Sequence, residues 1–419
     1  VTGFVKADVF ASGRVQLSYY QVDAGFPEGN IIFRDSLPVI KSLKDLEMDS
    51  VPPDFTNKIV RVKGSLQYVA GKGRNRILGE NYRPEWAKEI EVPVFDIGTR
   101  QGGLKITQKG GGMQTLSLRL EDSTGREYVL RSVEKFPEKA VPEMFRKTFI
   151  QGLVQDQISA AHPYAAVVIP PLAEAAGIYH TNPELVFIPD DPRLGIYRND
   201  FANMLALFEE RPDGDWSDKS FFGNSEDIIN TSKVLEKLAK DNDNRVDQSF
   251  VLRSRLFDMW IADWDRHDDQ WRWASFESKN GELYRPIPRD RDQAFFVNEG
   301  MIPKIWSRRW ALPKFEGFDD DIRWPSGLSY NARYFDRSFL TELPQEEWIA
   351  TAKDLQQRLT DDVIEASIKA WPKEIYDLHG NEIIRKLKSR RAKLVEYAVS
   401  HYKFLARHVD VVGSNKREF

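Results

Sequence analysis

Cysteine is absent from the 419 residues of this chain, and so are long apolar runs. Without cysteine there is no disulfide, no thiolate catalysis and no cysteine-ligated zinc or iron–sulfur site. No stretch approaches the roughly 18 apolar residues that a membrane-spanning helix needs. Lys and Arg total 60 against 64 Asp and Glu, so no excess of positive charge indicates nucleic acid as a partner.

Two hydrolase motifs are also missing. The chain contains no Gly-x-Ser-x-Gly turn that would present a serine nucleophile. It contains no Gly-Asn-His-Asp motif of the metallophosphoesterase type, so such phosphoester hydrolysis has no support in these residues. Aromatic residues are plentiful instead, with 11 Trp and 25 Phe, which predicts heavily packed cores or aromatic-lined clefts.

Residues 1–55 predict a small β segment. Val15, Leu17 and Tyr19 alternate with polar neighbours after the turn-prone Ser12-Gly13, and prolines mark a joint at the end of the segment. We interpret this segment as the tail of an upstream domain. The chain is then expected to be part of a longer protein, whose signal peptide or anchor would lie outside it.

The remaining residues divide into a β-rich lobe (56–212) and a helical lobe (213–419). Glycine-rich turns separate strands that we predict at residues 104–107, 128–135, 185–188 and 204–208, with one helix at residues 143–160. Helical spacing of apolar residues follows at residues 234–239, 250–261, 346–358, 361–370 and 383–407. An antiparallel β-lobe followed by a helical lobe predicts a two-lobed α+β fold.

Two acidic motifs carry most of the chemistry. Residues 263–271 read Asp-Trp-Asp-Arg-His-Asp-Asp-Gln-Trp and follow the predicted helix, while residues 285–295 read Arg-Pro-Ile-Pro-Arg-Asp-Arg-Asp-Gln-Ala-Phe. We expect strands at residues 282–287 and 293–297 to bring the second motif beside the first as a hairpin. Mg²⁺ is usually held by one or two carboxylates and phosphate oxygens, and a further carboxylate can orient a reacting hydroxyl. The alternative is a structural salt-bridge network walled by tryptophans.

The first motif resembles the catalytic loop of atypical protein-kinase-like enzymes. Asp265-Arg266-His267 with Gln270 five residues after the aspartate is similar to the loops of the spore-coat kinase CotH family, the secretory-pathway casein kinases and, more distantly, HipA-type kinases. Residues 288–292, Pro-Arg-Asp-Arg-Asp, resemble the CotH metal-binding stretch. The resemblance implies that Asp265 orients the acceptor hydroxyl, Gln270 assists the metal, and Asp290 or Asp292 binds Mg²⁺ or Mn²⁺ with ATP.

The β-lobe supplies the basic half of the expected site. Lys135 or Arg131, on one face of a strand, is the residue that the resemblance implies for phosphate binding, and Asp156 is the acid available on the following helix. Gly111 and Gly112 belong to a glycine triplet that could cover phosphates, with a plain hairpin turn as the alternative. Glu209 lies where an adenine-contacting hinge would fall.

The whole chain also resembles the non-phosphatase part of large bacterial surface proteins that carry a calcineurin-like metallophosphoesterase domain. This resemblance implies a cell-envelope location, periplasmic or on the outer surface. We therefore expect an ATP-dependent phosphotransferase whose acceptor is a protein, a sugar or a small molecule. The alternative is an inactive, pseudokinase-like binding or scaffold module, favoured by Gln270 in place of asparagine and by the lack of a helix glutamate.

Overall fold

Two antiparallel strands, β1 (Thr2–Val9) and β2 (Val15–Val22), form the hairpin at the start of the chain. The computed structural model describes residues 2–9, 15–22, 53–111, 115–136 and 149–408. These divide into two compact units: one combines Val1–Phe55 with Asp190–Ala202, and the other combines Thr56–Pro189 with Asn203–Phe419. All candidate site residues belong to the second unit.

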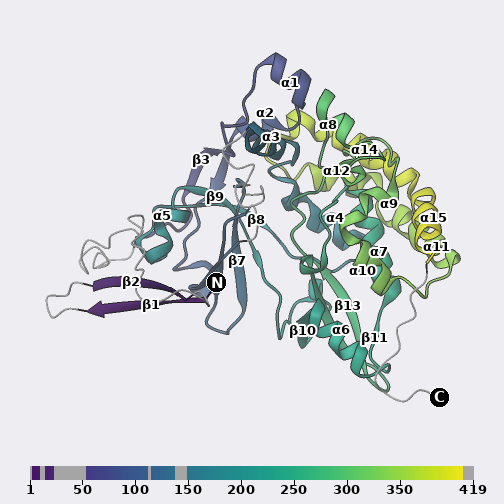
Figure 1. Cartoon of the computed structure of the whole chain (residues 1–419), viewed down its shortest axis with the longest axis horizontal. Helices are drawn as coiled ribbons and strands as arrows, with labels where there is room; N and C mark the ends of the chain where they lie inside the picture. Colours follow the sequence, from purple (N-terminus) through teal and green to yellow (C-terminus); the bar gives the residue numbers. More distant parts are fainter. Residues whose placement is uncertain (1, 10–14, 23–52, 112–114, 137–148, 409–419) are drawn as a thin grey trace. The chain divides into compact units, whose positions relative to one another are not determined.

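A five-stranded antiparallel sheet with the order β5-β6-β7-β9-β8 dominates the first half of the second unit (Figure 1). Its strands are β5 (Lys105–Gly110), β6 (Ser117–Glu121), β7 (Glu127–Ser132), β9 (Met204–Glu210) and β8 (Glu184–Ile188). Leu118, Leu130 and Phe208 are buried on one face, where Tyr128 stacks on Phe208 at 5.4 Å. The register places Arg119, Val129 and Glu209 in one row on the other face.

A second sheet lies in the helical half, with the order β10-β12-β13-β11. Its strands are β10 (Asp227–Asn230), β12 (Trp271–Glu277), β13 (Glu282–Pro288) and β11 (Arg245–Val246). β12 and β13 form an antiparallel hairpin from Trp271 opposite Pro288 to Glu277 opposite Glu282. This hairpin leads directly from the first acidic motif to the second. A further two-stranded sheet pairs β3 (Ile59–Lys63) with β4 (Glu89–Pro93).

Helix α7 (Gln248–Trp260) is the central helix of the second half. Asp247 caps its N-terminus by accepting a hydrogen bond from the Phe250 N–H at 3.0 Å, and its last ten residues are almost entirely buried. Trp260 Nε1 donates to the Leu387 carbonyl at 2.9 Å. Figure 1 shows α11 (Gln345–Arg358), α14 (Asn381–Ala392) and α15 (Leu394–Leu405) gathered around it.

The other helices are shorter. They are α1 (Lys72–Leu78), α2 (Arg83–Ala87), α3 (Phe149–Gln157), α4 (Ile169–Ala175), α5 (Arg198–Phe201), α6 (Thr231–Lys240), α8 (Met301–Trp306), α9 (Pro325–Leu328), α10 (Arg333–Phe339), α12 (Asp361–Ile368) and α13 (Lys373–Ile375). Among the residues that the structure describes, none of these or the longer helices could cross a membrane. The predicted α+β fold class, with antiparallel sheets and a helical C-terminal region, is confirmed.

Three predicted elements differ from the structure. Residues 293–297 do not form a strand: a turn spans residues 292–295, Phe295 has a left-handed backbone (φ 61°), and its N–H donates to the Ile261 carbonyl at 2.8 Å. The predicted helix at 383–407 is two helices, α14 and α15, separated at Lys393. The helix predicted at 143–160 is described from Phe149, and its first six residues lie outside the described ranges.

Candidate functional site

Asp290 and Asp292 lie in a turn that begins where β13 ends at Pro288. Asp290 has a left-handed backbone (φ 56°), which aspartate tolerates better than most residues. The Arg289 N–H donates to the Gln270 carbonyl at 2.9 Å and ties the turn to the first acidic motif. Neither aspartate belongs to a strand.

Cations from the five-stranded sheet contact both aspartates. Arg131 on β7 lies with its Nη1 3.1 Å from Asp290 Oδ2, and Lys135 just beyond β7 donates from Nζ to Asp292 Oδ2 at 2.7 Å. The two residues that the sequence left as alternatives for phosphate binding thus contact one aspartate each. The exposed fractions of these four side chains are 14%, 22%, 10% and 25%, so the pairs are screened from bulk water and remain reachable.

The pKa values of these groups shift in different directions. Burial opposes the charge on Lys135, but Asp292, Asp290 and Asp265 outweigh it and raise the pKa of the ammonium group. Burial likewise opposes ionisation of Asp290, yet Arg131 and Lys135 lower its pKa. Burial and the charge of Asp290 raise the pKa of Asp292 against the attraction of Lys135. Of the two carboxylates, Asp292 is therefore the one that takes up a proton more readily.

Asp265 lies in the loop after α7 and is held by a side chain from far downstream. Asn331 Nδ2 donates to Asp265 Oδ1 at 2.8 Å, and Lys314 Nζ donates to Asn331 Oδ1 at 3.2 Å. Lys314 also lies over the Trp264 ring at 5.2 Å. Sequence reasoning missed Asn331 and Lys314, because neither stands in a motif and Asn331 is 66 residues from Asp265.

Gln270 is buried at the end of the same loop. Its side chain lowers the pKa of Asp290 through a hydrogen bond, and its Nε2 is 3.4 Å from His267 Nε2. His267 is exposed. The structure thus places Gln270 beside the acidic turn, within the same cluster as Asp290.

A buried ionic network anchors the loop and the turn to helix α7. Asp258, fully buried on α7, contacts three guanidinium groups: those of Arg255 (2.9 Å), Arg266 (3.4 Å) and Arg291 (3.0 Å). Arg266 also donates from Nη1 to the Arg289 carbonyl at 2.6 Å, and burial raises the pKa of nearby Asp263 to about 7. The structural salt-bridge network considered as an alternative therefore exists among Asp258, Asp263, Arg266 and Arg291.

Two predicted partners occupy other positions. Asp156 does not pair with Lys135: its carboxylate accepts two hydrogen bonds from Arg83 at the start of α2 (3.1 and 2.6 Å) and contacts Arg74 at 2.6 Å. Glu209 pairs with Arg131 and accepts a hydrogen bond from Thr181 at 2.7 Å. The acid beside the sheet's cation therefore comes from the neighbouring strand β9 rather than from a helix.

The glycine triplet is only partly described. Gly111 has a φ of 123°, and a Cβ there would come within 2.4 Å of the Thr115 carbonyl, so this position requires glycine. Gly112 lies outside the described residues.

The donor set fits a metal that arrives with phosphate. No group of three His, Cys, Asp or Glu side chains in the described ranges could hold an ion by itself. Mg²⁺ commonly takes only one or two carboxylates and obtains its other ligands from phosphate and water. Asp290 and Asp292 match that requirement, with the Gln270 amide beside them.

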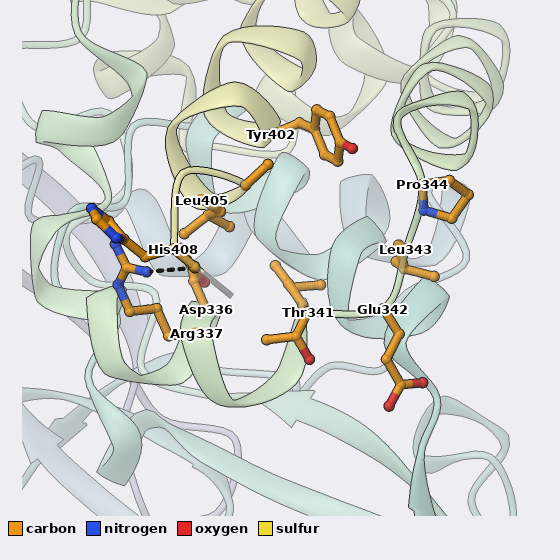
Figure 2. A pocket seen from close by; sticks show the side chains of 11 residues that line it. Asp336, Arg337, Thr341, Glu342, Leu343, Pro344, Tyr402, Leu405 and His408 are labelled. Atoms are coloured by element: carbon orange, nitrogen blue, oxygen red, sulfur yellow. Dashed lines mark hydrogen bonds between the residues drawn. The ribbon is translucent and has the colours of Figure 1, made fainter. Parts of the chain in front are cut away.

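A separate hollow of about 190 Å³ lies between the end of α10 and the end of α15 (Figure 2). Figure 2 shows Arg337 donating to the His408 carbonyl (3.1 Å), with Tyr402 and Leu343 on the opposite side. Asp336 lines it, but its carboxylate pairs with Arg255 and His401 inside the protein. In the described part of the chain, this hollow contains none of the predicted site residues.

No family model matches the chain, and no curated protein matches it. Among solved structures, the chain is similar to the Helicobacter pylori proinflammatory kinase CtkA, with 15% identity over 73% of this chain and 98% of that one, at a TM-score of 0.34. It is also similar to the amicoumacin kinase hAmiN in complex with AMP-PNP, Ca²⁺ and Ami, with 9% identity over 72% and 90%, at a TM-score of 0.19. Likeness this distant assigns no ligand and no residue role, so the residues themselves must carry the assignment.

Proposed function

We propose that this chain is a kinase-like phosphotransferase that binds ATP with Mg²⁺ or Mn²⁺ between the five-stranded sheet and the acidic turn. The observation that carries the proposal is the pair of contacts Arg131–Asp290 and Lys135–Asp292. In these contacts, two cations that could bind phosphate lie against two carboxylates that could bind metal. Asp265 lies close enough to raise the pKa of Lys135.

Ligand binding in this proposal is an exchange of partners. Triphosphate oxygens replace the carboxylates at Lys135 and Arg131, which frees Asp290 and Asp292 for the divalent ion. Asp290 and Asp292 would hold this ion, which would supply charge neutralisation at the phosphates. Because the cations and carboxylates neutralise one another without ligand, none of the four is left buried without an opposite charge.

Asp265 orients the acceptor. Its carboxylate, held by Asn331, would accept the proton of the acceptor hydroxyl as the new oxygen–phosphorus bond forms and the bond to the β-phosphate oxygen breaks. The nucleoside diphosphate then leaves. Such transfer depends mainly on positioning and charge neutralisation, which this set of residues supplies.

An inactive binding module, part of a bacterial surface protein with a metallophosphoesterase domain, is the second candidate. One observation favours it: the only helix acid considered for Lys135, Asp156, is instead paired with Arg83. A binding module would take nucleotide and release it unchanged. A cell-envelope location belongs to this proposal and rests on resemblance alone.

Turnover of ATP separates the two candidates. We expect the wild-type chain with Mn²⁺ to form ADP or to label itself from γ-labelled ATP, and Asp265→Asn to lower the rate roughly 100-fold or more while nucleotide affinity stays unchanged. Asp269→Asn, an exposed aspartate in the same loop, serves as the matched control. Binding without turnover would favour the inactive module, and absence of binding at millimolar ATP would contradict the kinase-like proposal.

A further inference from the structure

Four arginines from separate elements converge beside the acidic turn. They are Arg119 on β6, Arg211 after β9, Arg272 on β12 and Arg289 after β13, and we refer to them as the arginine cluster. Arg211 lies within electrostatic range of Arg119 and Arg272, and Arg289 lies within range of Arg272 and Arg211. The cluster is thus one group of charges rather than four separate surface residues.

The sheet register connects this cluster to the phosphate-binding candidates. Arg119 lies opposite Val129, and Arg131 is two residues along the same strand, so Arg119 and Arg131 extend from the same face. Arg289 adjoins Asp290 in sequence and is also within electrostatic range of Arg131. The arginine cluster therefore continues the cationic surface that begins with Lys135 and Arg131.

The arginine cluster has too few acids to neutralise it. In the described residues, Arg211 pairs with Glu127, and Arg272 is 3.8 Å from an oxygen of Asp213. Arg119 donates to the neutral Gln108 side chain at 2.9 Å, and Arg289 donates to the Asp269 carbonyl at 3.4 Å and is attracted by the neighbouring Asp290, which Arg131 also contacts.

Burial makes this shortage costly. The side chains of Arg211 and Arg272 are only 15% and 12% exposed, and the Nε atoms of Arg272 and Arg289 are buried without a hydrogen-bond partner. Unsatisfied charged donors in such a position destabilise a protein unless a ligand supplies acceptors.

Charge repulsion within the arginine cluster is visible in its pKa values. Burial and the charges of Arg119 and Arg272 lower the pKa of Arg211 to about 10. Burial lowers the pKa of Arg272, and Asp213 opposes the shift. A bound anion would counter each of these shifts.

The arginine cluster is reachable from solvent. A hollow of about 540 Å³ is lined by residues 124–127 and 213–215, which include Glu127 and Asp213, the two acids that contact Arg211 and Arg272. The hollow is lined by these acids rather than by the four arginines themselves, and all four arginines are partly exposed, so solvent reaches the arginine cluster.

We propose that the arginine cluster binds a multiply charged phosphate group of the substrate, next to the acidic turn. Guanidinium groups match phosphate oxygens in bidentate geometry, whereas a neutral sugar or base would leave them without counter-charge. The phosphate has two possible sources: the phosphate chain of the nucleotide itself, or an acceptor that already carries phosphate. The proposal rests on the arginine cluster alone and does not require that the chain transfers phosphoryl groups.

Titration with tripolyphosphate in the absence of metal tests the proposal. We expect the full chain to bind it, and the double variant Arg272→Gln, Arg289→Gln to bind it roughly 100-fold more weakly, because two charge-assisted contacts are lost. Arg245→Gln, an exposed arginine on β11 of the same sheet, should bind like wild type. Thermal unfolding without ligand checks that the double variant is folded. Absence of binding at millimolar tripolyphosphate, or equal affinity in the double variant, would overturn the proposal.

Competition with ATP and Mn²⁺ identifies the source of the phosphate. Mutual exclusion would assign the arginine cluster to the phosphate chain of the nucleotide, and simultaneous binding would assign it to a phosphorylated acceptor. Asp292→Asn separates this proposal from the proposed function: it should weaken binding of ATP with Mn²⁺ and leave metal-free tripolyphosphate binding intact. If the chain binds ATP with Mn²⁺ but not tripolyphosphate, the arginine-cluster proposal is wrong. If it binds tripolyphosphate but not ATP with Mn²⁺, the proposed function is wrong.

Discussion

At the scale of single residues, the site is a set of charges that neutralise one another until a ligand arrives. Lys135 and Arg131 could not be separated from sequence, because both extend from the same strand pattern, and the structure pairs one with each turn aspartate. Asp265 is different: its partner in the structure is a neutral amide, Asn331. A neutral amide can fix the position of a carboxylate without pairing its charge, as an acceptor-orienting residue requires.

Asn331→Ala should act on turnover rather than on binding. Without the amide, Asp265 loses the hydrogen bond that sets its position, and we expect turnover of ATP to fall roughly 10- to 100-fold with KM for ATP nearly unchanged. Steady-state kinetics measure both values. Asn280→Ala, in the exposed turn between β12 and β13, is the control. A rise in KM as large as the fall in kcat would show that Asn331 supports the fold of the site rather than the position of Asp265.

At the scale of elements, helix α7 holds the two acidic motifs together. Its apolar face was predictable from the spacing of Leu252, Leu256 and Met259, and the helix ends at Trp260, one residue before the predicted end at residue 261. What the pattern could not reveal is Asp258, one polar residue on that helix whose carboxylate meets guanidinium groups from both motifs. Local periodicity reports which face is buried but not which charges meet there.

Asp258→Asn should therefore destabilise the whole second unit. It leaves three buried guanidinium groups with one carboxylate fewer, and the expected loss is about 3–5 kcal/mol in the free energy of unfolding. Urea denaturation followed by tryptophan fluorescence measures the loss. Asp268→Asn, exposed in the loop, should change the midpoint little. A variant as stable as wild type would mean that the network does not anchor the motifs.

A second buried ionic contact, apart from the network around Asp258, joins α2 to the π-helical turn Tyr376–Gly380. His379 Nδ1 pairs with the buried Glu85, and this hydrogen bond, opposed by burial, raises the pKa of His379. Because the folded pKa lies above the ordinary value, the stabilisation is fully present below about pH 6.5 and is lost as pH rises through the folded pKa.

We accordingly expect His379→Gln to lower the free energy of unfolding more at about pH 6 than at about pH 9. Chemical denaturation at both pH values measures the difference between variant and wild type. His408→Gln, an exposed histidine, should show no such pH dependence. A constant difference across this range would contradict a charged His379–Glu85 pair.

At the scale of the whole molecule, the chain order of strands and helices was largely predictable, and the contacts between distant segments were not. Antiparallel strands bounded by glycine turns and helices with apolar spacing follow local rules. Asp156 is an example of a contact that the sequence does not reveal. The sequence places it on the correct helix, but its carboxylate pairs with Arg83, 73 residues earlier. The strand predicted at 293–297 failed for the same reason, since the Phe295 N–H bonds to Ile261 in a distant loop.

The second unit brings the cationic sheet and the acidic turn together across 157 residues of sequence, in the contact of Lys135 with Asp292. The most direct test is calorimetric titration of the full chain with ATP and Mn²⁺, comparing wild type with Asp292→Asn. We predict a single site in the wild type and binding roughly tenfold or more weaker in the variant, because one metal-binding carboxylate is lost. No binding at millimolar nucleotide, or equal affinity in the variant, would contradict a nucleotide–metal site at this turn.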